Sequence, residues 1–169
     1  MSYEAFMSAP KIAIYVETTI VSYITARPSR DPFLLGCQQL TRRWWRQDRG
    51  KFSLFTSQVV RDEAGRGEPL MAKRRSQVLK GISNLDFNDD ADALAKAILK
   101  KAPIPAKAAD DAFHIALAAV HGMNCLLSWN CRHISNIHTR RIVRGVCEKM
   151  GYQIPDLVTP FELQFLTFP

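Results

Sequence analysis

The sequence predicts an α/β fold, a three-layer sandwich in which helices cover both faces of a mainly parallel central sheet. Short apolar runs alternate with segments of helical length, which is typical of such sheets. The chain has 169 residues, of which 47% are hydrophobic, so it can bury one core. We therefore expect residues 11–169 to form a single domain behind a flexible N-terminal tail of residues 1–10.

The first half of the chain has clear boundaries between strands and helices. Ile12–Val16 is expected to be the first strand, and Thr19–Ala26 a short helix. Asp31 and Pro32 suit the N-cap and the first turn of a second helix, which we expect to run to about Arg49. The apolar side chains that recur at helical spacing in this second helix are predicted to face the core: Phe33, Cys37, Leu40 and Trp44.

The remaining elements continue the alternation. Ser53–Thr56 is the predicted second strand, and Ser57 is the N-cap of the helix that carries Glu63. The other predicted helices are Leu70–Ile82, Asp90–Lys101 capped by Asp89, Ala106–Val120 ended by Gly122, and Ile134–Met150. The other predicted strands are Leu85–Phe87, Asn124–Ser128 and Ile154–Val158, the last at an edge of the sheet.

Four polar side chains lie where this fold would bring them together. Glu17 ends the first apolar strand and Asn130 follows a later one, so both project from carboxyl ends of strands, where open parallel sheets bind their ligands. Glu63 lies on the helix after the second strand. Asp111 lies in a segment that is apolar on nearly every face, and a buried carboxylate needs a counter-charge or several donors. The pattern predicts a metal-ion site built from separate segments.

These segments resemble the PIN-domain ribonucleases and, within them, the VapC-like toxins of bacterial type II toxin–antitoxin systems. The resemblance is carried by four motifs in the expected order, which are Tyr15–Ile20, Ser57–Gly67, Asp111–Ala116 and Ser128–Ile134. It implies a PIN-like fold and a metal-dependent endoribonuclease that hydrolyses RNA phosphodiester bonds. It also implies a homodimer and a small cognate antitoxin that inserts into the active groove.

The sequence departs from the pattern of the family at two of the four positions. The first position is usually Asp and here is Glu17, whereas the fourth is often a second Asp and here is Asn130. Glutamate keeps the charge and adds a methylene, but asparagine keeps only an oxygen donor. The site therefore has about three formal negative charges, which suffice for one divalent cation.

Phosphodiester hydrolysis explains why acids would gather here. It requires a water deprotonated near neutral pH and a stabiliser for the charge that develops on the phosphate, and a hard divalent cation supplies both. Mg²⁺ or Mn²⁺ prefers oxygen ligands. We expect Glu17 and Asp111 to be direct ligands, and Glu63 and Asn130 to bind through water or to place a second metal.

Neighbouring side chains are expected to orient these ligands. Thr18 and Ser128 can hydrogen-bond the acids, and His114 lies one helical turn from Asp111, where it orients that acid or contacts a phosphate. His114 is equally compatible with a buried structural role. Asp110 and Asp111 point about 100° apart on a helix, so only one faces the site, and the resemblance selects Asp111.

Each remaining ligand has a simpler alternative explanation. Glu17 suits a helix N-terminus, Glu63 an exposed helical surface, and Asn130 a turn or an N-cap. A catalytically degenerate PIN-like domain that binds RNA or a protein partner is therefore the rival interpretation. A non-toxin RNA-processing nuclease is a third, since it has the same site and differs in its biology.

The charge of the chain favours a polyanionic partner such as RNA. Lysine and arginine number 23 against 16 acids, which gives a formal net charge of +7 and a pI near 9.5. A basic surface that serves solubility alone is the alternative. Arg132 and Arg140 follow Asn130 and are expected to grip RNA phosphates. Neither a membrane-spanning run nor a leader pattern is present, so we expect a cytoplasmic protein without membrane contact.

The four cysteines are expected to be reduced thiols. A chain of this size can build a core without disulfides, and it lacks a secretory leader pattern. A zinc site drawn from Cys125, Cys131, His133 and His138 matches the common ligand spacings only at its histidine pair. Structural zinc is therefore the weaker alternative.

Overall fold

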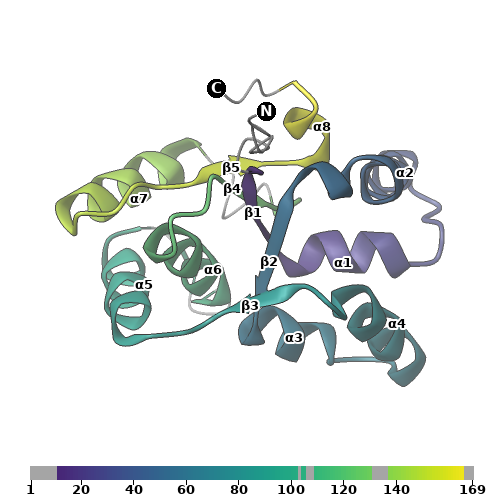
Figure 1. Ribbon diagram of the computed structural model, residues 1–169, viewed down its shortest axis with the longest axis horizontal. Helices are drawn as coiled ribbons and strands as arrows, with labels where there is room; N and C mark the ends of the chain where they lie inside the picture. The colour runs from purple at the N-terminus through teal and green to yellow at the C-terminus, as the bar shows by residue number, and fades with distance from the viewer. Residues whose placement is uncertain (1–10, 103, 106–108, 131–136, 166–169) are drawn as a thin grey trace, which may run out of the picture.

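The central sheet has five strands that are all parallel, with helices on both of its faces (Figure 1). The computed structural model describes residues 11–102, 104–105, 109–130 and 137–165. The predicted α/β three-layer fold is confirmed. The predicted N-terminal tail, residues 1–10, lies outside the described residues.

The order of the strands creates a topological switch point between β1 and β4. β1 (Ala13–Val16) is central and pairs with β2 (Ser53–Ser57) and β4 (Cys125–Leu127), while β3 (Ser83–Leu85) and β5 (Asp156–Val158) are the edges. The chain builds outward from β1 to β3 and later returns to place β4 on the other side of β1. The carboxyl ends of β1 and β4 therefore flank the topological switch point, where open α/β sheets bind ligands.

Two groups of helices cover the sheet, and Figure 1 shows them on opposite sides of it. The first group packs around α1 and comprises α1 (Thr18–Thr25), α2 (Pro32–Gln47), α3 (Gln58–Ala64) and α4 (Pro69–Leu79). The second group comprises α5 (Asp89–Lys101), α6 (Ala109–Val120) and α7 (Ile137–Lys149). A short 3₁₀ helix, η1 (Arg49–Lys51), precedes β2, and α8 (Pro160–Leu163) follows β5. Of the helices described, none is long and apolar enough to cross a membrane.

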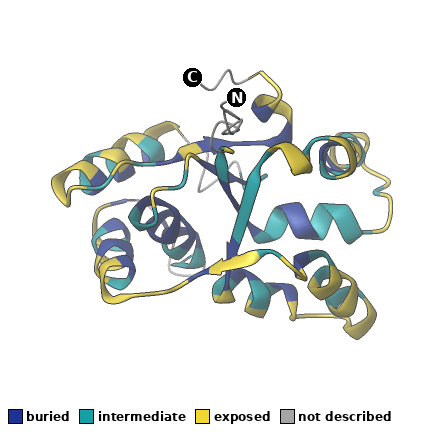
Figure 2. Ribbon diagram, in the orientation of Figure 1, coloured by how far each residue is buried: buried dark blue, intermediate teal, exposed yellow. Residues whose placement is uncertain are grey.

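The central strands are buried on both faces. Ile14, Tyr15 and Val16 of β1 and the whole of β4 are inaccessible to solvent, whereas the edge strand β3 is largely exposed (Figure 2). Continuous apolar runs are typical of parallel strands covered by helices on both sides. The strands that carry Glu17 and Asn130 at their ends are therefore rigid supports for a site.

Polar residues cap several helices, as the sequence predicts at two of them. Asp31 accepts a hydrogen bond from the N–H of Leu34 (2.9 Å), and Ser57 accepts one from the N–H of Val60 (3.3 Å). These bonds satisfy N–H groups that have no partner inside a helix. The cap at α5 was predicted wrongly, because Asn88 rather than Asp89 accepts the bond from the first turn.

Two predictions about apolar residues are also wrong. The third strand is Ser83–Leu85 instead of Leu85–Phe87, because β3 pairs with β2 from Ser83 onward and Leu85 is its last, buried residue. Phe33 is 75% exposed, although Cys37 and Trp44 of the same stripe are buried. The first turn of α2 faces a cavity next to α8 instead of the sheet, which explains this exposure.

The described cysteines are reduced thiols. Cys37, Cys125 and Cys147 are buried and form no disulfide, which confirms the predicted reduced state for these three. Burial raises the pKa of Cys125 to about 12 and that of Cys147 to about 11, so neither is a reactive thiolate near neutral pH. Cys131 and His133 of the alternative zinc site lie outside the described residues.

The buried strand β4 should dominate stability. Leu126→Ala leaves a void between the two helical layers and is expected to lower the free energy of unfolding by about 2–5 kcal/mol. Leu70→Ala, at an exposed position of α4, is the matched control and should change it by less than about 0.5 kcal/mol. Urea denaturation of both variants checks this, and equal losses would contradict the described core.

Candidate metal centre

Glu17 is the residue that follows β1, and its buried carboxylate is anchored through one of its two oxygens. It is the N-cap of α1, and its Oε2 accepts hydrogen bonds from the backbone N–H of Thr19 (3.0 Å) and the hydroxyl of Thr19 (2.5 Å). The hydroxyl of Ser128, which follows β4, also donates to Oε2 (2.8 Å). The carboxylate thus joins β1, α1 and the end of β4, and its position leaves it little freedom.

Glu63 is held by a second chain of hydrogen bonds. The hydroxyl of Thr18 donates to its Oε2, and His114 Nε2 lies 3.1 Å from the same oxygen. A carboxylate only accepts, so Nε2 carries the proton. Nδ1 of His114 lies 2.8 Å from the Tyr15 hydroxyl, which lies 2.7 Å from that of Ser57. This series of hydrogen bonds therefore links α3 to α6 through Tyr15 in the buried strand β1.

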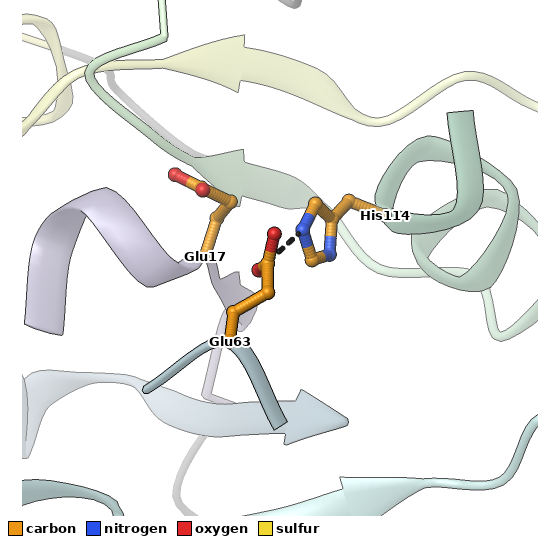
Figure 3. Close-up of side chains that lie close together, drawn as sticks. All are labelled: Glu17, Glu63 and His114. Carbon is orange, nitrogen blue, oxygen red and sulfur yellow. Dashed lines mark hydrogen bonds and ion pairs between the residues drawn. The ribbon is translucent and has the colours of Figure 1, made fainter. Parts of the chain in front are cut away.

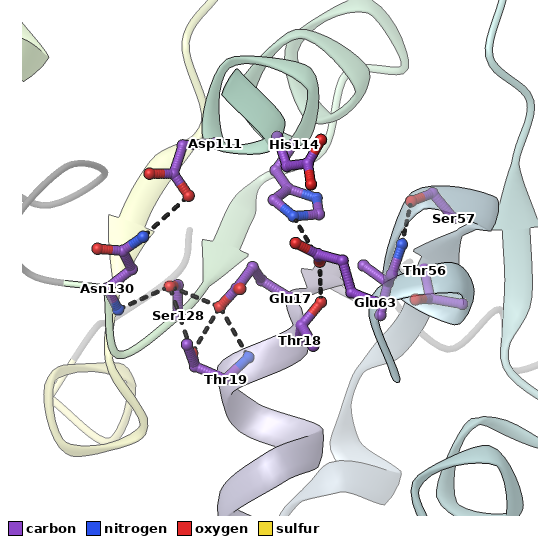
Figure 4. A network of polar contacts seen from close by, with 12 residues as sticks. Glu17, Thr18, Thr19, Thr56, Ser57, Glu63, Asp111, His114, Ser128 and Asn130 are labelled. Atoms are coloured by element: carbon purple, nitrogen blue, oxygen red, sulfur yellow. Dashed lines mark hydrogen bonds and ion pairs between the residues drawn. The ribbon is translucent and has the colours of Figure 1, made fainter. Parts of the chain in front are cut away.

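Asp111 and Asn130 form the other side of the network. Asn130 Nδ2 donates to Asp111 Oδ1 (2.9 Å), and the backbone N–H of Asn130 donates to the Ser128 hydroxyl (2.9 Å). Ser128 in turn donates to Glu17. Figure 4 shows these contacts as one continuous line from α6 to the start of α1.

The hydrogen-bonded residues around Glu17 and those around Glu63 come close together in a compact group of potential ligands. Carboxylate oxygens of Glu17 and Glu63 and a ring nitrogen of His114 all lie within 4.8 Å of one another. Figure 3 shows that they come from three different elements, the end of β1, α3 and α6, and converge on one point. That point lies at the carboxyl ends of the strands beside the topological switch point.

Electrostatics couple Glu63 to His114. Burial raises the pKa of Glu63, but the hydrogen bond and the positive charge of His114, with the Thr18 hydroxyl and the charge of Arg66, outweigh it and bring the pKa below its ordinary value. Burial lowers the pKa of His114, but the hydrogen bond to Glu63 and the charges of the surrounding carboxylates raise it overall. Each partner therefore stabilises the charged form of the other.

Tyr15 contacts the ring nitrogen of His114 that does not face Glu63. Burial, with the charges of Glu17 and Glu63, raises its pKa far above the ordinary value, so the phenol stays neutral. A neutral hydroxyl can donate to Nδ1 of an uncharged His114 or accept from a protonated one. The ring of His114 is thus fixed in both protonation states, in the way that hydrogen-bond partners orient the side chains around metal sites.

Trp129 anchors the segment between Ser128 and Asn130. Its backbone N–H donates to the Thr19 hydroxyl (2.8 Å) and its indole N–H to the Thr41 hydroxyl (2.7 Å). Its ring is stacked near that of Tyr23, with centroids 6.2 Å apart. Because Thr19 also binds Glu17, the loop after β4 and the first acid are held by the same hydroxyl.

The structure brings Glu17 and Glu63 together with His114, but Asp111 lies outside this group of potential ligands. Asp111 and Asn130 reach Glu17 through Ser128, whereas Thr18 and His114 bond Glu63. His114 lies closer to the centre than predicted, since its Nε2 pairs with Glu63 and its ring is part of the group of potential ligands. Whether these residues bind a metal stays a prediction.

The two predicted RNA-binding arginines are placed differently. Arg132 lies outside the described residues. Arg140 lies in the first turn of α7 and borders a cavity near β5 and α8 that also contains Asp156 and Glu162. The sequence interpretation missed Tyr15 and Thr19, although a hydroxyl inside an apolar strand and one directly after an acid were visible signals.

Comparison with known proteins adds no assignment. The chain matches no family model, and no curated protein matches it. The interpretation of the site therefore depends on its geometry and on its chemistry.

The pair formed by Glu63 and His114 predicts a pH dependence of stability in the metal-free protein. The raised pKa of His114 contributes stability that is complete below its ordinary 6.5 and is lost as the pH rises through the folded value. The lowered pKa of Glu63 contributes stability above its ordinary 4.5 that is lost as the pH falls through the folded value. The pair is therefore most stabilising between pH 4.5 and 6.5.

Urea denaturation in chelator, followed from pH 5 to 9, measures this effect. The wild type should lose stability above pH 6.5 through the titration of His114. Glu63→Gln removes the charge of the partner and should flatten that loss, whereas His121→Gln, at a histidine bonded to the Asp86 carbonyl, should leave it unchanged. An unaltered pH profile in Glu63→Gln would rule out the coupling.

Proposed function

We propose that this protein is a metal-dependent endoribonuclease that hydrolyses RNA phosphodiester bonds. The observation that carries the proposal is the convergence of Glu17, Glu63 and His114 within 4.8 Å at the switch point of a parallel sheet. Asp111 and Asn130 adjoin this group through Ser128. The net charge of +7 supports a polyanionic substrate.

The carboxylates of this group fit a hard divalent cation such as Mg²⁺ or Mn²⁺, whereas His114, whose Nε2 proton is bonded to Glu63, positions that acid and is not itself a ligand. Carboxylate and amide oxygens are the ligands that these ions prefer. The hydrogen bonds described for Glu17 and Glu63 all go to Oε2, so Oε1 of each carboxylate is available to a cation or to a water bound to it. Protein donors thus hold one oxygen of each acid in place and present the other.

The residues of the chain then have distinct roles in hydrolysis. When bound, the cation lowers the pKa of the attacking water and balances the charge that develops on the phosphate. Glu17 would hold the cation with Asp111, which adjoins it through Asn130 and Ser128, and Glu63 and Asn130 would act through water. His114 fixes the carboxylate of Glu63, and the amide of Asn130 orients that of Asp111.

The resemblance to VapC-like toxins supports a biological setting for this activity. In that setting the protein is the cytoplasmic toxin of a toxin–antitoxin pair, forms a homodimer, and is blocked by a small cognate antitoxin. An RNA-processing nuclease outside such a pair has the same chemistry. An adjoining gene for a short DNA-binding protein would separate the two.

A degenerate PIN-like domain that binds RNA or a protein without cleavage is the second candidate. The pairing of Glu63 with His114 favours it, because a protonated imidazole balances one of the negative charges without a metal. Asn130 removes a further charge from the position where the family often has Asp. Metal binding and cleavage distinguish the two candidates directly.

Cleavage by the wild type should require added Mg²⁺ or Mn²⁺ and stop with chelator, while duplex DNA stays largely intact. Glu17→Gln keeps size but removes the charge that binds the cation, so activity should fall about a hundredfold or more. Glu17→Asp should keep measurable activity. Fluorescent single-stranded RNA reports cleavage, and calorimetry with Mn²⁺ reports binding.

The control for these variants is Glu148→Gln, an exposed acid on α7. It should cleave RNA and bind Mn²⁺ as the wild type does. If Glu17→Gln also matches the wild type at limiting Mg²⁺, Glu17 is only the cap of α1. Mn²⁺ binding without cleavage of any RNA would favour the degenerate domain.

Expression in a bacterial host should arrest growth, and Asp111→Asn should relieve the arrest. The substitution removes one ligand charge but keeps the shape of the side chain, so circular dichroism should be unchanged. Asp89→Asn, an exposed residue at the start of α5, is the control and should stay toxic. Arrest by Asp111→Asn equal to that of the wild type would exclude Asp111 as a ligand.

A further inference from the structure

A cavity of about 270 Å³ lies beside the candidate metal centre. Its walls come from α3, the segment after β3 and α6, and its lining residues are Val59, Asp62, Arg66, Phe87, Asp110 and Phe113. Three of these immediately precede site residues in the sequence, namely Asp62 before Glu63, Asp110 before Asp111 and Phe113 before His114. The cavity and the metal centre therefore draw on the same two helices, at neighbouring faces about 100° apart.

An aromatic pair forms one wall of this cavity. The rings of Phe87 and Phe113 lie edge to face, with centroids 5.5 Å apart and an interplanar angle of 63°. Phe87 is 45% exposed, so part of its ring is open to a ligand. Exposed aromatic rings are the surfaces on which single-stranded nucleic acids stack their bases.

An ion pair of low strength spans the cavity. Arg66 Nη1 lies 3.8 Å from Asp110 Oδ2, and both side chains are substantially exposed, so the pair contributes little to stability. The backbone under Arg66 is fixed, because Arg75 donates to the carbonyls of Ala64 (2.7 Å) and Arg66 (2.5 Å). The guanidinium can thus change partner at small cost while its attachment point stays in place.

Arg66 also lies close to the metal centre. Its backbone N–H donates to the carbonyl of Glu63 (3.1 Å), a candidate ligand. A guanidinium carried next to a ligand residue is well placed to act on a phosphate bound beside that ligand, and Arg recognises phosphate with several parallel hydrogen bonds.

The charged residues that line the cavity favour a base over a phosphate as the group that enters it. Asp62 and Asp110 outnumber the single Arg66, so the interior repels a phosphate. Carboxylates accept hydrogen bonds from the amino groups of bases. Adenine, cytosine and guanine have an exocyclic amino group, whereas uracil has none. The volume is below the roughly 300–1,000 Å³ of pockets for larger ligands, which fits one base.

We propose that this cavity binds one base of single-stranded RNA beside the cleaved bond, and that it prefers an amino-bearing base to uracil. The base stacks on Phe87 and Phe113 and donates to Asp110, while Arg66 turns from Asp110 to the adjoining phosphate. The nucleotide thus replaces the ion pair between Arg66 and Asp110 with a contact from its base to Asp110 and one from its phosphate to Arg66. The choice of RNA as ligand rests on the proposed function.

Binding in chelator tests this subsite without metal or cleavage. The probes are fluorescein-labelled twelve-nucleotide chains of adenylate, cytidylate and uridylate, and an abasic chain of equal length, measured by fluorescence anisotropy. The wild type should bind the adenylate and cytidylate chains more tightly than the uridylate and abasic chains. Phe87→Ala should weaken adenylate binding about tenfold, since each base stacked on an aromatic ring contributes strongly to affinity.

Matched variants separate the cavity from general surface effects. Phe161→Ala, at a residue of similar exposure (49%) on α8, should bind as the wild type does. Arg66→Gln should weaken binding of every chain and reduce the slope of log affinity against log salt by roughly 0.7, the share of one phosphate contact. Arg74→Gln, an exposed arginine of α4, should leave that slope unchanged.

The outcomes distinguish this inference from the proposed function. Equal affinities for all four chains, no binding, or equal effects of Phe87→Ala and Phe161→Ala would overturn the base-binding subsite. Cleavage by the wild type with a KM that Phe87→Ala does not change would overturn the subsite alone. Base-dependent binding through Phe87 without cleavage in Mn²⁺ would support the subsite and overturn only the nuclease.

Discussion

The carboxylate of Glu17 is the point at which three separate segments of the fold meet. Its Oε2 accepts hydrogen bonds from the N–H and the hydroxyl of Thr19 at the start of α1 and from the hydroxyl of Ser128 after β4. A buried carboxylate without such donors would be strongly destabilising, so β1, α1 and β4 must be placed together for it to be tolerated. The parallel pairing of β1 with β4 provides that placement, and the rest of the network depends on it.

The site holds its shape through internal charge balance. His114 lies between Glu63 and Tyr15 and is close enough to Glu17 and Asp111 to respond to their charges. A cluster of acids with no cation would push the pKa of at least one acid upward, and the imidazole offsets this repulsion. A bound divalent ion would assume the same role, so His114 and the ion compete to neutralise one set of carboxylates.

The sequence predicts the fold and the strand-end residues because their signals are local. Glu17 and Asn130 each follow an apolar strand, and the order of strands and helices implies a parallel sheet. The partner of His114 lies 51 residues away, at Glu63, so helix periodicity within α6 cannot reveal it. The cap of α5 fails for a different reason, since Asn88, Asp89 and Asp90 are three adjacent residues that all suit an N-cap.

Residues of the metal centre and residues of the cavity are direct neighbours along α3 and α6, and this limits which substitutions can change the cavity alone. Asp62, Asp110 and Phe113 face the cavity, and their sequence neighbours Glu63, Asp111 and His114 belong to the polar network. Substitutions at adjoining positions rarely act independently, because a backbone shift at one is felt at the other. Any evolutionary or engineered change in the shape of the cavity therefore tends to disturb the acids, and new variants should arise mainly through Phe87, which stands on a separate segment.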